Sequence, residues 1–293
     1  MSILVEFLAD LTYGILTGGV YALIAVGLSL SFGMMGIVNF AHGSIVMLGM
    51  YATYYSFTHL GLHPYLSMAL VIPLFFLFGM VLEVGLFRFM YNVPHNNQFL
   101  LTCGLMIVLN NLALSAFSAN MRTVQVSFLE EGFSLGGIVI SYGRFLAFVV
   151  GVIFYLLLTL FLRKTIIGKA IRASAQNREG AKLCGINVST IYTYAFGVGI
   201  MFAGVAGLLI LPFSGAYPDV GDTFILTAFI IVVLGGMGNI SAAFWASLII
   251  GVAEALGATF MSSGVKYLFP FIIFIGVLLF RPTGLFVRKT GNG

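Results

Sequence analysis

Long runs of apolar residues without charge are the feature that most limits how this chain can fold. The run at residues 191–211, for example, contains no Asp, Glu, Lys or Arg. A helix of about 20 apolar residues crosses the hydrocarbon core of a bilayer. Charged residues make up only 8% of the 293-residue chain, whereas soluble domains carry about a quarter. The sequence therefore predicts an all-α integral membrane protein and excludes a soluble domain.

Such segments follow one another along the whole chain, so we expect a polytopic helical bundle of about eight or nine transmembrane segments. The polar stretch at residues 118–141 separates two of them, and its SFLEEGFSLGGIVIS pattern predicts a small hairpin. The predicted segments cover residues 11–32, 44–57, 65–87, 99–117, 145–162, 191–211, 223–234, 242–258 and 267–280.

Two glycine-rich interruptions divide neighbouring apolar segments, GMMGIVNFAHG at residues 33–43 and GGMGNIS at residues 235–241. In each one a glycine stands three residues before an asparagine. Paired interruptions of this kind point to a transport pathway, because unwound backbone at membrane depth must be buried in protein or line a cavity. The alternative is a pair of tight turns between hairpin helices, since glycines also punctuate spans.

A basic island at residues 163–187 is the one long polar stretch with a dense positive charge. Such an island beside apolar spans belongs on the cytoplasmic side. It also predicts a short helix, with Asn177 as its N-cap, Leu183 lying against the preceding turn and Gly185 ending it. The alternative is an ordinary cytoplasmic loop. Its six basic residues, opposed by the single acid Glu179, are Arg163, Lys164, Lys169, Arg172, Arg178 and Lys182.

The basic island also fixes an expected orientation for the chain. With the island inside the cell, nine crossings place the N-terminus outside and the C-terminal tail inside. The turn around Arg88 then lies inside, and the loop with Glu130 and Glu131 lies outside. Glu83 precedes Arg88 by about one helical turn, so we expect the two to form a structural ion pair.

Five polar residues in or beside the apolar segments are candidates for lining a translocation pathway, since intramembrane polar groups are functional by default. They are Asn39, His42, Asn110, Asn239 and Glu254. Structural alternatives stay open for three of them. Asn39 suits the cap of the helix that follows it, and Asn110 suits hydrogen bonding across helices. Glu254, which looks like the most buried acid, could instead be hydrated near the outer end of its segment.

The remaining residues indicate neither a metal site nor an enzyme. His42 lacks an evident second ligand, and neither Cys103 nor Cys184 has a nearby His or Cys partner. No zinc, nucleophile-elbow or aspartyl-pair pattern lies inside the spans. The net charge of +4 does not predict nucleic-acid binding, because the basic residues cluster at span ends. A stand-alone secondary carrier remains an alternative, although only Glu254 could couple transport to an ion.

Three separated motifs, in order along the chain, resemble the LivH-type permeases of bacterial ABC importers for branched-chain amino acids. They are GLSLSFGMMGIVNFAHGSIVMLGMY, GKAIRASAQNREGAKLCGI and LGGMGNISAAFWASLIIGVAEALG, and the resemblance extends over residues 11–285. The island matches part of the EAA-G motif by which such permeases dock their ATPase. Glu179, Ala181 and Gly185 agree with the motif, whereas Gly180 replaces its second residue. The later hydrophobic-x-Leu-Pro part is missing, and Ala195, Gly197 and Val198 stand there instead.

This resemblance implies one permease domain over residues 1–293, with residues 163–187 as the cytoplasmic coupling segment. Residues implied to couple to the ATPase are Arg178, Glu179, Gly180, Ala181 and Gly185. Expected partners are a second related permease, two ATPase subunits that bind the ATP, a periplasmic binding protein and the bilayer of the bacterial inner membrane. The permease itself would be no enzyme and hold no cofactor. The implied substrates are leucine, isoleucine and valine; urea or short amides are the alternative.

Overall fold

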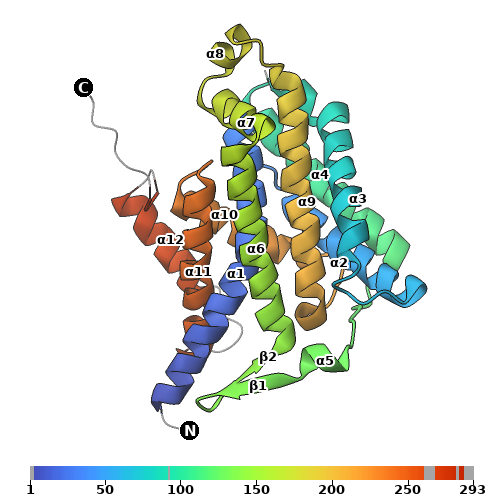
Figure 1. The fold of residues 1–293 in the computed structure, drawn as a ribbon, viewed down its shortest axis with the longest axis vertical. Helices are drawn as coiled ribbons and strands as arrows, with labels where there is room; N and C mark the ends of the chain where they lie inside the picture. Colours follow the sequence, from blue (N-terminus) through green and yellow to red (C-terminus); the bar gives the residue numbers. More distant parts are fainter. Residues whose placement is uncertain (1–2, 92, 261–267, 282–283, 287–293) are drawn as a thin grey trace.

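The computed structural model describes residues 3–91, 93–260, 268–281 and 284–286, and the predicted all-α class is confirmed (Figure 1). A single two-stranded hairpin interrupts the helices in these ranges. In chain order the elements are α1 (Ile3–Met35), α2 (His42–Leu60), α3 (Met68–Gly85), the 3-10 helix η1 (Phe87–Met90), α4 (His95–Phe117), α5 (Ser127–Glu130), β1 (Gly132–Leu135), β2 (Ile138–Ser141), α6 (Tyr142–Lys164), α7 (Ile166–Gln176), α8 (Arg178–Leu183), α9 (Val188–Ser214), α10 (Val220–Gly235), α11 (Ile240–Phe260) and α12 (Leu268–Phe280).

Each apolar segment predicted from the sequence contains a helix. Six helices, α1, α3, α4, α6, α9 and α11, are long and apolar enough to cross a membrane. The apolar helices α10 and α12 are shorter. The 19-residue α2 carries more polar side chains, and many of its residues are buried. The predicted polytopic bundle is therefore confirmed.

Helices α1 and α9 form the centre of the bundle, because they are buried along most of their length. Glycines allow the close packing around them. A Cβ atom on Gly251 of α11 would lie 2.3 Å from the carbonyl oxygen of Gly14 of α1. A Cβ on Gly207 of α9 would lie 2.1 Å from the carbonyl oxygen of Val46 of α2. By contrast, α3, α4 and α6 expose many apolar side chains, as lipid-facing helices do.

Both predicted interruptions exist, between α1 and α2 at residues 36–41 and between α10 and α11 at residues 236–239. The second interruption packs against the last turn of α1, just before the first one, because a Cβ on Gly33 would stand 3.0 Å from the Cα atom of Gly238. Each asparagine accepts a backbone hydrogen bond, Asn39 from Ala41 and Asn239 from Ala242, both at 3.1 Å. Asn239 directly precedes α11 and bonds its third residue, as a helix cap does. The expectation that Asn39 caps α2 is wrong, because the N-cap of α2 is Ala41 and it makes no side-chain cap bond. Asn39 instead closes an Asx-turn just before the helix.

Two opposite ends of the bundle matter for function, and Figure 1 shows both. The hairpin end carries β1 and β2, paired antiparallel with Gly132 opposite Ser141. The tight turn places Gly136 at φ +60° and Gly137 at φ +88°, where side chains are disfavoured. The predicted hairpin is therefore confirmed. The other end, which we call the α8 end, carries α7 and α8, the two helices of the basic island.

Candidate functional site

Helix α8 at the tip of the α8 end has the boundaries that the sequence predicted. The Oδ1 atom of Asn177 accepts a hydrogen bond of 2.8 Å from the Gly180 backbone N–H, which caps the first turn. At the other end Gly185 takes φ +80°, and its N–H donates to the Lys182 carbonyl at 2.9 Å. The Ile186 N–H donates to Ala181 at 3.1 Å, which closes a glycine C-cap. The island also holds a second helix, α7, which was not predicted from the sequence.

One face of α8 is anchored on the bundle. The guanidinium of Arg178 lies over the rings of Tyr91 and Tyr192, 5.6 Å from each centroid. Cation–π contacts of this kind are attractive when the ring faces the charge. Ala181, one turn later, is buried. Arg178 and Ala181 therefore position the helix, and Gly180 and Gly185 serve its two caps.

The opposite face of α8 is open to solvent. Glu179 pairs with Lys182 at 2.8 Å, and the Glu179 side chain is 74% exposed. The hydrogen bond and the charge of Lys182 lower the pKa of the Glu179 carboxyl below its usual value. The expectation that Leu183 lies against the preceding turn is wrong, because this leucine is 90% exposed. Leu183 comes two residues after the buried Ala181, and that spacing turns it to the other side of the helix.

A buried carboxylate connects the anchor of α8 to the transmembrane helices. Glu83 of α3 is fully buried and accepts hydrogen bonds from Arg88, at 3.3 Å, and from the hydroxyls of Tyr91 and Thr193. The predicted Glu83–Arg88 pair is confirmed. The expectation that Glu254 is the most buried acid is wrong, because Glu83 has 0% exposure and Glu254 has 8%. Tyr91 thus touches both Glu83 and Arg178, and the contacts run from α8 into α3 and α9.

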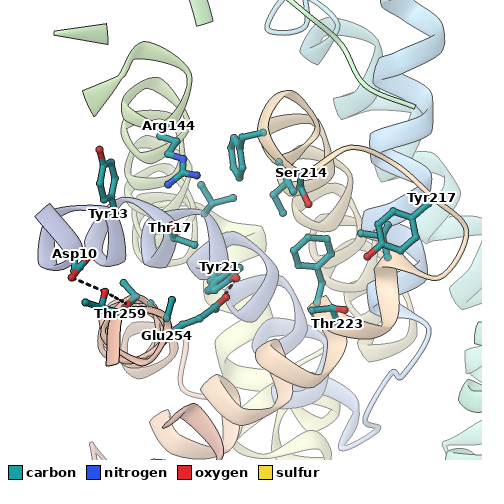
Figure 2. A pocket seen from close by; sticks show the side chains of 18 residues that line it. Asp10, Tyr13, Thr17, Tyr21, Arg144, Ser214, Tyr217, Thr223, Glu254 and Thr259 are labelled. Atoms are coloured by element: carbon teal, nitrogen blue, oxygen red, sulfur yellow. Dashed lines mark hydrogen bonds between the residues drawn. The ribbon is translucent and has the colours of Figure 1, made fainter. Parts of the chain in front are cut away.

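A cavity of about 450 Å³ lies toward the hairpin end, among α1, the start of α6, the α9–α10 connection and α11 (Figure 2). Four of its residues recur every three or four positions along α1 and so share one face of that helix. These are Asp10, Tyr13, Thr17 and Tyr21. The cavity falls in the volume range typical of sites for small molecules.

Charged groups of both signs line this cavity. The Tyr21 hydroxyl donates to Glu254 at 2.8 Å, and the Thr259 hydroxyl donates to Asp10 at 2.7 Å. The guanidinium of Arg144 lies 5.5 Å from the ring centroid of Tyr13. Glu254 was predicted from the sequence as a pathway residue, whereas Asp10 and Arg144 were not. No local motif marks those two, because they come from distant segments and meet only in the folded bundle.

The other predicted pathway residues do not line this cavity. The amide of Asn110 accepts from Ser44 at 2.7 Å and donates to Asp222 at 3.1 Å, so it bonds across three helices. One imidazole nitrogen of His42 lies 3.1 Å from the Ile24 carbonyl oxygen, deep in the bundle. Asn39 and Asn239 belong to the two interruptions. The structure therefore disperses the five candidates, and a pathway role for them stays a prediction.

A bundle of apolar helices with paired interruptions, an anchored helix at one end and a polar cavity toward the other defines a multi-pass membrane permease. Residues 11–278 match the family model described as branched-chain amino acid transport system / permease component. The chain belongs to this family, and the resemblance noted from its motifs is confirmed. A permease component is one part of a transport system that has further components.

Known relatives cover almost the whole chain. The high-affinity branched-chain amino acid transport system permease protein BraD of Pseudomonas aeruginosa is 32% identical over 97% of this chain and 96% of its own length. The permease protein LivH of Escherichia coli K12 is 31% identical over 96% of each. The solved structure of PsaBC from Streptococcus pneumoniae in complex with Fab has a TM-score of 0.51 at 15% identity. The match covers 96% of this chain and 97% of the PsaBC chain, and it shows that the two share a fold.

Proposed function

We propose that this chain is the permease subunit of an ATP-driven importer that carries leucine, isoleucine and valine from the periplasm to the cytoplasm. The observation that carries the proposal is α8, a capped helix that is anchored on one face and open on the other. The names of relatives at 31–32% identity support the substrate class. The chain itself makes and breaks no covalent bonds in the substrate, and partner subunits bind the ATP.

Coupling to the ATPase follows from the two faces of α8. The exposed face offers Glu179, Lys182 and the apolar Leu183 to a groove on a cytoplasmic ATPase subunit. The buried face passes any displacement of α8 to Tyr91 and Tyr192 through Arg178. Because Tyr91 also bonds the buried Glu83, the displacement reaches α3 and α9 as a rigid-body movement. Residues 163–187 form the coupling segment of a single permease domain over residues 1–293.

The same proposal assigns the orientation and the partners. The α8 end faces the cytoplasm, because it carries the basic island. The N-terminus and the hairpin then lie on the periplasmic side of the bacterial inner membrane, and the C-terminus lies inside. A periplasmic binding protein delivers the substrate at the hairpin end, and a second, related permease completes the pathway. Two ATPase subunits dock at the α8 ends of the permease pair.

The test is uptake of labelled leucine into vesicles that contain the complete transporter and its binding protein. We expect uptake to require ATP and to continue after a protonophore removes the proton gradient. Unlabelled isoleucine and valine should compete, whereas urea and acetamide should not. Uptake that ignores ATP and stops with the protonophore would instead identify a secondary carrier. Competition by urea or acetamide alone would move the substrate class to short amides.

A further inference from the structure

We propose that the cavity toward the hairpin end, lined by Arg144, Asp10 and Glu254, is a binding site for the zwitterionic head of an α-amino acid. The inference rests on the proposed function and deepens it, because it gives the permease a substrate site of its own. The ligand carboxylate would bind Arg144, and the ligand ammonium would bind the acidic side of the cavity.

Arg144 suits the carboxylate for two reasons. It stands at the start of α6 and lines the cavity, stacked over Tyr13 at 5.5 Å and Phe213 at 5.8 Å. Among the residues that the structure describes, its guanidinium takes part in no ion pair. A guanidinium held by ring contacts keeps its N–H donors for a carboxylate, which it can bind through two parallel bonds.

The acidic side of the cavity suits the ammonium group. Glu254 is buried on α11, and Tyr21 donates a hydrogen bond to it, which fixes the direction of the carboxylate. Asp10 is held by Thr259 in the same way. A carboxylate accepts through two oxygens and about four lone-pair positions, so a hydroxyl donor does not exclude an ammonium donor at the same group. In Figure 2 the Arg144 guanidinium and the Glu254 carboxylate stand apart, with Thr17 between them in the view.

An apolar wall completes the site. Its members come from α1, α9 and α10 and are buried, and they are Val20, Ile210, Val220 and Phe224. A branched aliphatic side chain would lose water against this wall. The site would therefore contact the carboxylate, the ammonium group and the side chain of the ligand. These three contacts together would select for an apolar α-amino acid. The cavity volume of about 450 Å³ leaves room for a ligand of this size.

The first experiment measures equilibrium binding of tritiated leucine to the purified transporter complex in lipid nanodiscs, without the binding protein. We expect saturable binding to the wild type. Arg144→Gln and Glu254→Gln should each weaken it by at least about tenfold, the loss expected when one charged hydrogen-bond partner is removed. Matched controls are Arg122→Gln and Glu131→Gln, which lie outside the cavity lining and should leave binding unchanged.

Two leucine analogues separate the two charges. We expect 4-methylpentanoate, which lacks the ammonium group, and 3-methylbutylamine, which lacks the carboxylate, to compete at least about tenfold more weakly than leucine. In the Arg144→Gln variant the difference in affinity between leucine and 3-methylbutylamine should become smaller, because the group that binds the ligand carboxylate is gone. A substitution that merely disturbed the fold would weaken every ligand together.

A zwitterionic phospholipid head group offers the same two charges, so glycerophosphoethanolamine is tested as a competitor. The inference holds if leucine binds and glycerophosphoethanolamine does not displace it. It is overturned if glycerophosphoethanolamine binds in place of leucine, if leucine does not bind, or if both cavity variants bind leucine like the wild type. ATP-driven leucine uptake by the wild type in those cases would leave the proposed function standing. Absence of ATP-driven uptake would remove the proposed function itself.

Discussion

Glu83 shows how a single buried residue organises the α8 end. Its carboxylate receives bonds from η1, from the turn that follows it and from α9. The Arg88 pair was expected because the two residues are close in the sequence, but they do not lie on one helix. Helix α3 ends at Gly85 and Arg88 lies on η1, so the break between the two helices brings the side chains together. The sequence could not predict Thr193, which is distant along the chain and meets Glu83 only when α3 packs on α9.

We predict that Glu83→Ala destabilises the protein by about 3 kcal/mol, the lower end of the cost of breaking a buried ion pair. The loss of stability should stay near this lower value, because the Arg88 side chain is 40% exposed and can be hydrated once its partner is removed. The measurement is thermal unfolding of the purified protein in detergent. Glu131→Ala, at an exposed position, is the matched control and should leave the midpoint unchanged. An equal midpoint for Glu83→Ala and the wild type would contradict this role.

Among the helices, features that depend on neighbouring residues were predictable from the sequence, whereas contacts between distant segments were not. The caps of α8, the hairpin turn and both interruptions were predictable, because each depends on glycine or asparagine within a few residues. Helix α7 was not, because the basic composition of the island hid its apolar face. The cavity was also out of reach of the sequence, since α1, α6 and α11 contribute residues whose approach only the packed bundle determines.

Close backbone contact between α2 and α10 gives a prediction at this scale. A Cβ atom on Gly43 would lie 2.1 Å from the Gly221 carbonyl oxygen and 2.8 Å from the Cβ of Ile225. Because backbone must move to admit it, Gly43→Ala should cost about 1–3 kcal/mol, as overpacking does. Gly104→Ala in α4 is the control, since a Cβ there meets nothing within 4 Å. We expect Gly43→Ala to unfold at a lower temperature than Gly104→Ala. Equal unfolding midpoints would show that α2 and α10 are not packed this closely.

At the scale of the whole molecule, the nine apolar segments and the basic island were sufficient to predict the bundle and its ends. Positive charge determines which end stays in the cytoplasm. We therefore predict that Cys184, exposed beside α8, reacts with a membrane-impermeant maleimide in inside-out vesicles and not in intact spheroplasts. Ser134→Cys on β1, made in a Cys103→Ala, Cys184→Ser background, should show the reverse pattern. Labelling of Cys184 from outside the cell would show that the chain has the opposite orientation.

Docking of an ATPase on α8 can be tested by purifying the protein from its native membrane in mild detergent. Mass spectrometry then identifies the proteins that remain bound. We expect the wild type and Leu135→Asp, altered at the exposed tip of the hairpin, to retain an ATPase and a second permease. Glu179→Lys and Leu183→Asp should lose the ATPase but remain inserted and folded. A wild-type chain that purifies alone, or an ATPase that stays bound to both α8 variants, would show that α8 does not dock the ATPase.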